Sequence, residues 1–570
     1  RPESAQPMEY SGLRVVYNGE IYNYAEIRAE LKGRGHNFKT VSDTEVLLHA
    51  FSEWGPECVH RFIGMFAFVV VDENRRTVYL VRDRAGVKPL YVYRSPDRLV
   101  FASELRALRR YPGFRPKLDA VAFSRFFDYG YVPSGRSIYR DVVKLMPGTM
   151  QCVDLDSGET RIERYWSLDD SFRNDRLHLD YQGASDRLAD LLRSASRYRM
   201  VSDVPVGVFL SGGYDSTAVL ASLRASADAP IKAFTIGFET GNNELPQARR
   251  IAAALGCEHF EYICTEADAR EIIPDLPEIY DEPFADSSAI PTVLVARFAA
   301  QYVKVALSAD GGDELFLGYD SYAVLGRRLA RLGRLPRPMR RWLAAALQSA
   351  AAVVPKARVQ RRHLLRGLSL ALDEDNATMA RRLHILARQL PQDYRNRLFV
   401  GFREASCEDA MLAVNAFDPL DEAASWDYGH YLVDDILVKV DRATMSTSLE
   451  GREPLLDHRL AEFAARLPRS YRYDGSVRKR ILRDYVHTHV PREIMDGPKR
   501  GFSVPVLPWL RGELVGLLDE HLSEDALRVS GLFRPAAIAP LVQNFRAGRL
   551  HYSPLIWKLL MFQMWYRRWM

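Results

Sequence analysis

Between residues 181 and 310, short apolar stretches alternate with stretches of helical spacing, and this alternation constrains the fold more than any other feature of the chain. The apolar runs PVGVFL, IKAFTIGF, HFEYI and VKVALSAD have strand length, whereas STAVLASLRAS and ELPQARRIAAAL have helical spacing. Strands that alternate with helices in this way form a parallel sheet covered by helices. The sequence therefore predicts an α/β domain here, followed by a mostly helical part from about residue 320.

The first 165 residues follow a different pattern, in which short apolar runs are separated by turn-forming residues. Two of these runs, MFAFVVVD and TVYLVRD, are joined by the polar ENRR and predict an antiparallel hairpin. A polar stretch at 166–180 predicts a linker. Because 570 residues exceed one ordinary core, we predict two domains, 1–165 and 181–570.

Composition narrows the functional class. The net charge of +5 suits small anionic substrates and does not require a nucleic acid. The five cysteines are scattered and form no CxxC pair, which argues against a disulfide framework or a structural zinc site and favours a cytoplasmic protein. No apolar run approaches about 18 residues, so we expect no membrane-spanning helix.

The segment GRRLARLGRLPRPMRRWLAAAL (326–347) is basic and amphipathic. It has two interpretations. One is a helix that binds a membrane surface or RNA. The other is a solvated helical face within a large α-rich region, and we favour this second interpretation.

The stretch GVFLSGGYDS (207–216) places a glycine pair between a strand and a helix. Without a Cβ, the backbone can approach a ligand closely, and the amides at the start of the helix favour an anion. Asp215 would repel a bare phosphate, so it indicates a divalent cation between its carboxylate and a nucleotide. No Walker A sequence occurs, and SGGxDS instead resembles the pyrophosphate loop of ATP pyrophosphatases. The alternative is a glycine-rich turn that binds nothing.

A second glycine pair, in VALSADGGDELFLGY (305–319), also follows a predicted strand. Loops at the carboxyl ends of parallel strands meet at one edge of a sheet, so both loops can contact one nucleotide. Asp215 and Asp313 would then share a magnesium ion. Lys499, in the loop GPKRGFSVP, could stabilise charge that develops at an α-phosphate. Charged residues in 431–457 are either part of such a site or form salt bridges.

Together these motifs resemble the glutamine-hydrolysing asparagine synthetase family. In the second part the resemblance rests on SGGYDS, LSADGGDELFLGY, DEPFADSSAIP, DDILVKVDRATMSTSLEGREPLLD and PKRGFS; in the first part it rests on VVYNGEIYNY, VSDTEV, GMFAFVVVD, RDRAGVKPLY and FASELRAL. It implies an N-terminal-nucleophile glutaminase of stacked antiparallel sheets, then an ATP-pyrophosphatase synthetase. In the family, ATP and Mg²⁺ convert the aspartate side chain to an acyl-adenylate, and ammonia from glutamine displaces AMP.

The resemblance also assigns residues. Asn18 and Gly19 match oxyanion-hole donors, while Glu20 and Asp43 match contacts to glutamine. The residues that match nucleotide contacts are Leu210, Ser211, Gly212, Gly213, Asp215, Ser216, Ile236, Ser308 and Ala309. Magnesium would be bound by Asp215 and Asp313, and the catalytic pair would be Lys499 and Asp310. The expected partners are small-molecule substrates and not a nucleic acid, and a homodimer is left open.

The chain departs from the family pattern in three respects. The family nucleophile is an N-terminal Cys, but no Cys precedes Cys58, which we interpret as a core residue, and we expect an N-terminally incomplete glutaminase-like domain. Ala309 and Leu317 stand where the pattern has Gly, so Leu317 should reshape the floor of the loop. The basic helical region from about 325 to 400 exceeds what the family layout needs.

Other functions share these motifs. The acceptor could be a uronic-acid sugar, a peptide or an antibiotic precursor in place of aspartate. A non-catalytic scaffold would retain the fold without exchange of pyrophosphate into ATP. A tRNA-modifying pyrophosphatase would share SGGxDS, but it would need an RNA-binding appendage or further cysteines, and neither is evident.

The missing nucleophile generates the first prediction. We expect a protein that begins at Arg1 not to hydrolyse glutamine, because no N-terminal thiol is available to attack the amide. Labelled glutamine incubated with this protein should remain unconverted. Formation of labelled glutamate would contradict the prediction.

Overall fold

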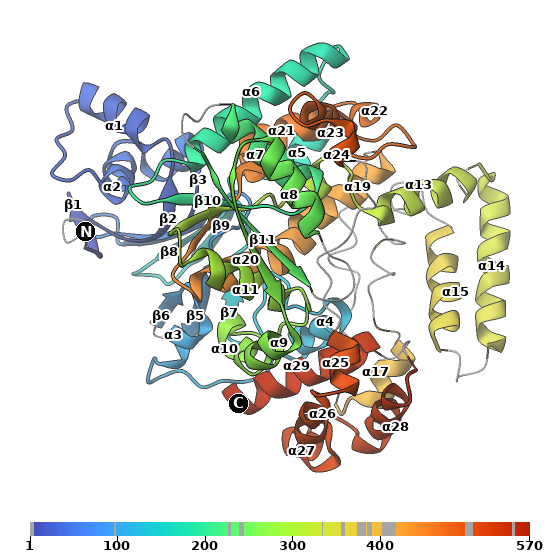
Figure 1. Cartoon of the computed structure of the whole chain (residues 1–570). Coiled ribbons are helices and arrows are strands. Elements are labelled where there is room, and N and C mark those ends of the chain that lie inside the picture. Colours follow the sequence, from blue (N-terminus) through green and yellow to red (C-terminus); the bar gives the residue numbers. More distant parts are fainter. Residues whose placement is uncertain are drawn as a thin grey trace.

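The structure is a computed structural model of the chain. It describes residues 5–95, 98–225, 230–238, 244–332, 334–354, 359–372, 384, 390, 392–401, 418–495, 506–549 and 553–570. The first part of the chain is built on antiparallel strands, and the second part on a parallel sheet followed by helices (Figure 1).

The larger antiparallel sheet has six strands in the order β1-β2-β3-β4-β8-β9. Their bounds are Met8–Tyr10, Leu13–Ile21, Gly64–Asp72, Thr77–Arg82, Thr149–Asp154 and Thr160–Arg164. The predicted hairpin is confirmed, because β3 and β4 pair from Ala67 with Arg82 to Asp72 with Thr77. A second antiparallel sheet has the order β6-β5-β7, with bounds Arg98–Ala102, Tyr91–Ser95 and Val142–Lys144.

Strand β3 is buried on both faces, and this explains its unbroken apolar sequence. Successive side chains of a strand point to opposite sides. Phe66 and Phe68 therefore belong to the core formed with helices α1 (Tyr24–Gly33) and α2 (Asp43–Trp54). Val69 belongs to a separate core that includes residues of the smaller sheet. The six-stranded sheet thus lies between helices on one side and the second sheet on the other.

The parallel sheet has the order β12-β11-β10-β13-β14, and every pair is parallel. The bounds are Glu258–Cys264, Lys232–Phe238, Val206–Phe209, Val305–Leu307 and Glu450–Arg452. The first four strands confirm the alternation predicted from the sequence. Strand β14 was not predicted, because its three residues, Glu-Gly-Arg, carry no apolar signal.

Helices cover both faces of this sheet. On one face α6 (Tyr181–Arg199), α7 (Tyr214–Arg224) and α8 (Leu245–Ala254) share a core with the strands. On the other face α11 (Ala289–Ala299) and α20 (Leu437–Met445) share a core with them. Segment 166–180 contains a short helix, α5 (Leu168–Arg173), whose apolar side chains are buried.

The two halves of the molecule share one hydrophobic core. Phe123 and Phe126 on α4 (Ala120–Tyr129) pack against Phe562 on the C-terminal helix α29 (Ser553–Trp569). Buried charges also cross the boundary. Lys88 Nζ lies 2.9 Å from an Asp441 carboxylate oxygen, and both side chains are almost completely buried.

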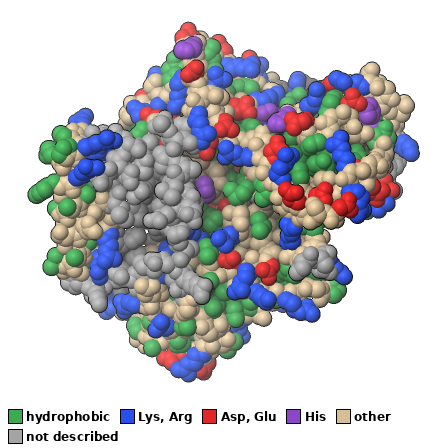
Figure 2. Space-filling model, turned by 180° about the vertical axis from the view of Figure 1, so that it is seen from behind, with side chains coloured by type: hydrophobic (Ala, Val, Ile, Leu, Met, Phe, Trp, Pro, Cys, Tyr) green, Lys and Arg blue, Asp and Glu red, His purple; other side chains and the backbone are tan. Residues whose placement is uncertain are grey.

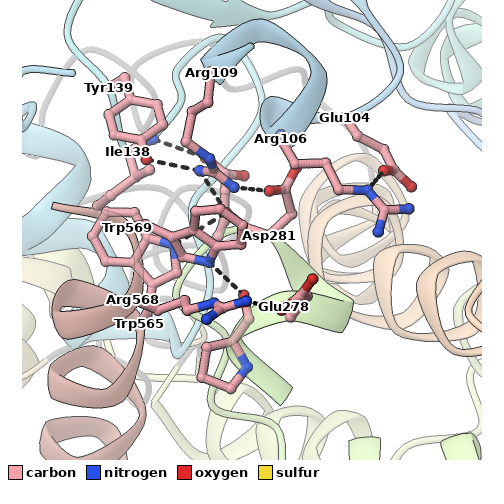
Figure 3. A network of polar contacts seen from close by, with 12 residues as sticks. Glu104, Arg106, Arg109, Ile138, Tyr139, Glu278, Asp281, Trp565, Arg568 and Trp569 are labelled. Carbon is pink, nitrogen blue, oxygen red and sulfur yellow. Dashed lines mark hydrogen bonds and ion pairs between the residues drawn. The ribbon is translucent and has the colours of Figure 1, made fainter. Parts of the chain in front are cut away.

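A polar cluster around Asp281 closes another part of the boundary (Figure 3). Asp281 forms an ion pair with Arg109 and accepts a 2.9 Å hydrogen bond from the backbone N–H of Arg106. The indole of Trp565 donates to the Asp281 carbonyl at 3.1 Å, and the Arg109 guanidinium lies 3.6 Å from the ring centre of Trp569. The end of α29 is thereby tied to both halves of the molecule.

Three helices project from the body as an extended unit (Figure 1). They are α13 (Asp320–Leu332), α14 (Arg337–Val353) and α15 (Val359–Leu372), and we call them the helical arm. Helix α14 packs closely along α15, and Ser369 Oγ donates to the Ala344 carbonyl at 2.8 Å. Among the described helices, none is long and apolar enough to cross a membrane.

The buried pair at the boundary yields a stability prediction. Replacing Lys88 with Met leaves the Asp441 carboxylate buried without its partner, which costs about 3 kcal/mol of unfolding free energy. The double change Lys88→Met with Asp441→Leu should recover most of this loss, since no charge is left unpaired. Urea unfolding measures the unfolding free energy of the single and the double variant. As a control, Lys117→Met at an exposed position should change stability by less than about 0.5 kcal/mol, and equal stability of all variants would contradict the prediction.

Candidate functional site

Two loops leave the carboxyl ends of neighbouring parallel strands and face one cavity of about 910 Å³. Strands β10 and β13 pair directly, with Val208 opposite Leu307, so the loops that follow them start side by side. The cavity is lined by these residues predicted from the sequence: Leu210, Ser211, Gly212, Gly213, Asp215, Ser216, Ile236, Ser308, Ala309, Asp310 and Asp313. The structure therefore brings together every predicted residue of the second domain that it describes.

The first loop is held by its own hydroxyl groups. Ser216 Oγ lies 2.9 Å from the Ser211 carbonyl and 2.9 Å from Ser211 Oγ. Helix α7 begins just after Gly213, so its first amides face the cavity with the positive end of the helix dipole. This arrangement is suited to a phosphate group.

A lysine that the sequence did not single out joins the two loops. Lys479 Nζ lies 2.6 Å from an Asp313 oxygen and is also within ion-pair distance of Asp215. Burial alone would lower the pKa of Lys479, but the two carboxylates outweigh burial and raise it to about 12. The ammonium group is therefore charged at neutral pH. It occupies the space between the two aspartates that were predicted to share a magnesium ion.

The backbone around this ion pair requires glycine at two positions. A Cβ on Gly312 would lie 2.4 Å from the Asp215 carboxylate, and a Cβ on Gly318 would overlap the side chain of Lys479. Leu317 adopts a left-handed φ of 56°, which costs about 1 kcal/mol for a residue with a Cβ. Its side chain is fully buried beneath the loop, where the family pattern has Gly. Ala309 does not have a positive φ, so its methyl group fits without strain.

A second lysine also lines the cavity. Lys439 Nζ lies 2.8 Å from Asp286 and 2.9 Å from Ser288 Oγ. Burial alone would raise the pKa of Asp286, but the Lys439 ammonium group and the hydrogen bonds from Ser288 leave it below its usual value. Asp310 accepts a 2.6 Å hydrogen bond from Ser308 Oγ, and burial raises its pKa.

Charged residues of 431–457 form salt bridges, which is one of the two interpretations offered for them. Lys439 belongs to this segment and pairs with Asp286. Asp441 pairs with Lys88, and Arg452 pairs with Glu450 at 2.6 Å. Lys439 also lines the cavity, so this residue both forms a salt bridge and belongs to the candidate site. Lys499 lies outside the described residues, and its predicted role stays a prediction.

The residues predicted to bind glutamine lie near one another in the first domain. Asn18, Gly19 and Glu20 are on β2, and Asp43 begins α2 beside that strand. Asp43 accepts a hydrogen bond from the Ile21 amide at 3.1 Å. Burial, assisted by Asp43, raises the pKa of Glu20 to about 8, although Arg452 of the second domain lies 3.7 Å away.

Cys58 is a core residue, as predicted. Its side chain is fully buried among the helices on the six-stranded sheet, and burial raises the pKa of its thiol far above the usual value. A thiol of this kind is not a nucleophile at neutral pH.

Comparisons with known proteins identify the family of this chain. A family model described as asparagine synthase matches residues 187–567, and one described as a glutamine amidotransferase domain matches residues 1–166. The chain belongs to the asparagine synthase family. The family resemblance predicted from the motifs is therefore confirmed, and the family is one of carbon–nitrogen ligases.

Several curated proteins are similar over most of the chain. Asparagine synthetase [glutamine-hydrolyzing] 1 of Bacillus subtilis is 30% identical, and the match covers 98% of this chain and 87% of that protein. Asparagine synthetase [glutamine-hydrolyzing] 3 of the same organism is 27% identical over 86% of this chain and 76% of that protein. Amidase chry2 of Gibberella zeae is 26% identical over 92% of this chain and 82% of that protein. Relatives of this chain therefore carry more than one functional name.

The lysine between the two aspartates yields a binding prediction. In Lys479→Met, measured without added Mg²⁺, the two carboxylates face the cavity without a positive partner and repel phosphates. We expect the affinity for ATP to fall about 30-fold, equivalent to about 2 kcal/mol for a charged hydrogen bond. Isothermal titration calorimetry measures the affinity of each variant for ATP. The exposed Lys304→Met is the matched control and should bind ATP as the unchanged protein does, and an unaltered affinity of Lys479→Met would contradict the prediction.

Proposed function

We propose that the chain is an ATP-dependent amidotransferase that activates a carboxylate by adenylation and converts it to an amide. The observation that carries the proposal is the convergence of the Asp215 and Asp313 loops on one cavity lined by amides, hydroxyls and a lysine. Membership of the asparagine synthase family supports it. A carboxylate is a poor electrophile, and attachment of AMP gives it a good leaving group.

Each part of the cavity has a role in this proposal. The amides and hydroxyls of Ser211, Gly213 and Ser216 would bind the pyrophosphate portion of ATP. The paired carboxylates of Asp215 and Asp313 fit Mg²⁺, which prefers one or two carboxylates together with water and substrate phosphates. The ion would neutralise phosphate charge. Lys479 would exchange its aspartate partners for phosphate oxygens, because it remains charged throughout the neutral range.

The carboxylate acceptor would enter beside the α-phosphate. Its oxygen would form a bond to that phosphorus while the bond to pyrophosphate breaks, and ammonia would then displace AMP. Asp310 lies in the same cavity with a raised pKa, in a position to interact with the intermediate. Aspartate is the acceptor that the family membership favours. The similarity to a protein named as an amidase leaves other carboxylic acids as alternative acceptors.

The chemistry can be tested with ammonium salt as the nitrogen source, which avoids any need for glutamine hydrolysis. We expect pyrophosphate exchange into ATP only with a suitable carboxylate, AMP as the product, and asparagine when the carboxylate is aspartate. A panel of carboxylic acids measured by AMP release identifies the acceptor. ADP as the product, or no exchange with any carboxylate, would refute the proposal.

Variants connect this activity to the cavity. Asp215→Asn and Asp313→Asn should each lower the exchange rate about 100-fold, since each removes a carboxylate that would hold Mg²⁺ against the phosphates of the transition state. The exposed Asp525→Asn is the control and should leave the rate unchanged.

A further inference from the structure

The helical arm has an unusual charge. Residues 320–372, which span the arm, contain twelve Lys and Arg and a single acidic residue, Asp320 at its first position. The whole chain has a net charge of only +5, so the rest of the protein is net acidic. The net positive charge of the protein therefore comes from one projecting unit (Figure 1).

Many of these charges face solvent. Helix α13 buries Leu325 and Leu329 against the body of the protein. Its opposite side and the turn that follows expose a row of arginines: Arg327, Arg328, Arg331, Arg334 and Arg337. In Figure 2 the lobe at the left shows hydrophobic and basic side chains and no acidic ones.

Helix α14 differs from an ordinary solvated helix. Its inner side, including Ala344 and Ala351, is buried, and the helix packs along α15. Its outer side exposes Met339 (54%), Trp342 (74%) and Val353 (80%). These three positions are separated by 3 and 11 residues, which places them on one face about 21 Å long. A solvated face would carry charges there, whereas an apolar face indicates a binding surface.

We propose that the helical arm is a docking surface for a membrane containing anionic phospholipids. Exposed arginines are attracted to anionic headgroups, and an apolar helical face that includes a Trp can enter the boundary between headgroups and acyl chains. An arm-to-arm contact between two copies of this chain does not fit the same surface, since two strongly cationic arms repel each other. A nucleic acid would satisfy the arginines but not the aliphatic side chains of α14. The protein would lie on the membrane and not span it.

The proposal departs from part of the sequence interpretation. A solvated helical face was favoured for 326–347, and the exposed side of α13 agrees with it. The outer face of α14 does not, because its exposed Met, Trp and Val side chains have no partner within the part of the chain that the structure describes. The proposal stands independently of the chemistry in the cavity.

Co-sedimentation of the full chain with vesicles tests the proposal. We expect binding to vesicles of phosphatidylglycerol and phosphatidylcholine in equal amounts, weaker binding at high salt, and little binding to pure phosphatidylcholine. The double variant Arg327→Gln with Arg331→Gln should lower the partition coefficient about 25-fold, because each arginine near an anionic surface contributes about five-fold. Trp342→Gln should lower it about ten-fold.

Two exposed arginines outside the arm supply the matched control. Arg75→Gln with Arg161→Gln removes the same charge and should leave vesicle binding nearly unchanged. Thermal unfolding of each variant checks that the fold is retained. Equal binding to both vesicle types, an absence of binding, or an equal effect of the control variant would overturn the proposal. Tighter binding to a single-stranded RNA homopolymer than to the vesicles would also overturn it.

Discussion

The cavity depends on one electrostatic constraint, which is that two neighbouring carboxylates in a half-buried site do not both stay ionised unless a cation lies between them. Lys479 meets this constraint by pairing with both Asp215 and Asp313. The pairing brings together two loops that follow neighbouring strands and a helix, α23 (Arg480–His487), from much later in the chain. Glycines at 312 and 318 leave the space that the arrangement needs. In the proposed reaction, the same two carboxylates would bind Mg²⁺ once Lys479 has exchanged them for phosphate oxygens.

A second constraint applies at the boundary between the halves of the molecule, where buried charges must be paired. Glu282 accepts hydrogen bonds from Tyr91 at 3.1 Å and from the Ile138 amide at 2.8 Å, both in the first half. Four residues later, Asp286 pairs with Lys439 on the wall of the cavity. One short segment therefore connects the domain boundary with the cavity. The shape of the cavity wall depends on how the first domain is docked.

The helical arm differs from the rest of the protein in the charge and the apolar character of its surface. Several buried charges in the body of the protein are paired, such as Lys88 with Asp441, whereas the arm exposes unbalanced positive charge and an apolar helical face. Such a surface costs free energy in water unless something covers part of it. The cavity and the arm are thus separate features of one chain.

The sequence by itself determined the two architectures, the hairpin of β3 and β4, four of the five parallel strands and both glycine loops, because these depend on local periodicity and turn chemistry. It also placed Cys58 in the core. Only the tertiary structure decided that Lys479 lies between Asp215 and Asp313, that the three-residue strand β14 joins the sheet, and that Lys439 reaches Asp286. These contacts join residues more than 100 positions apart, and no local pattern encodes them. The exposure of Trp342 was likewise decided by packing, since an apolar residue on a helix is equally consistent with a buried face and an exposed one.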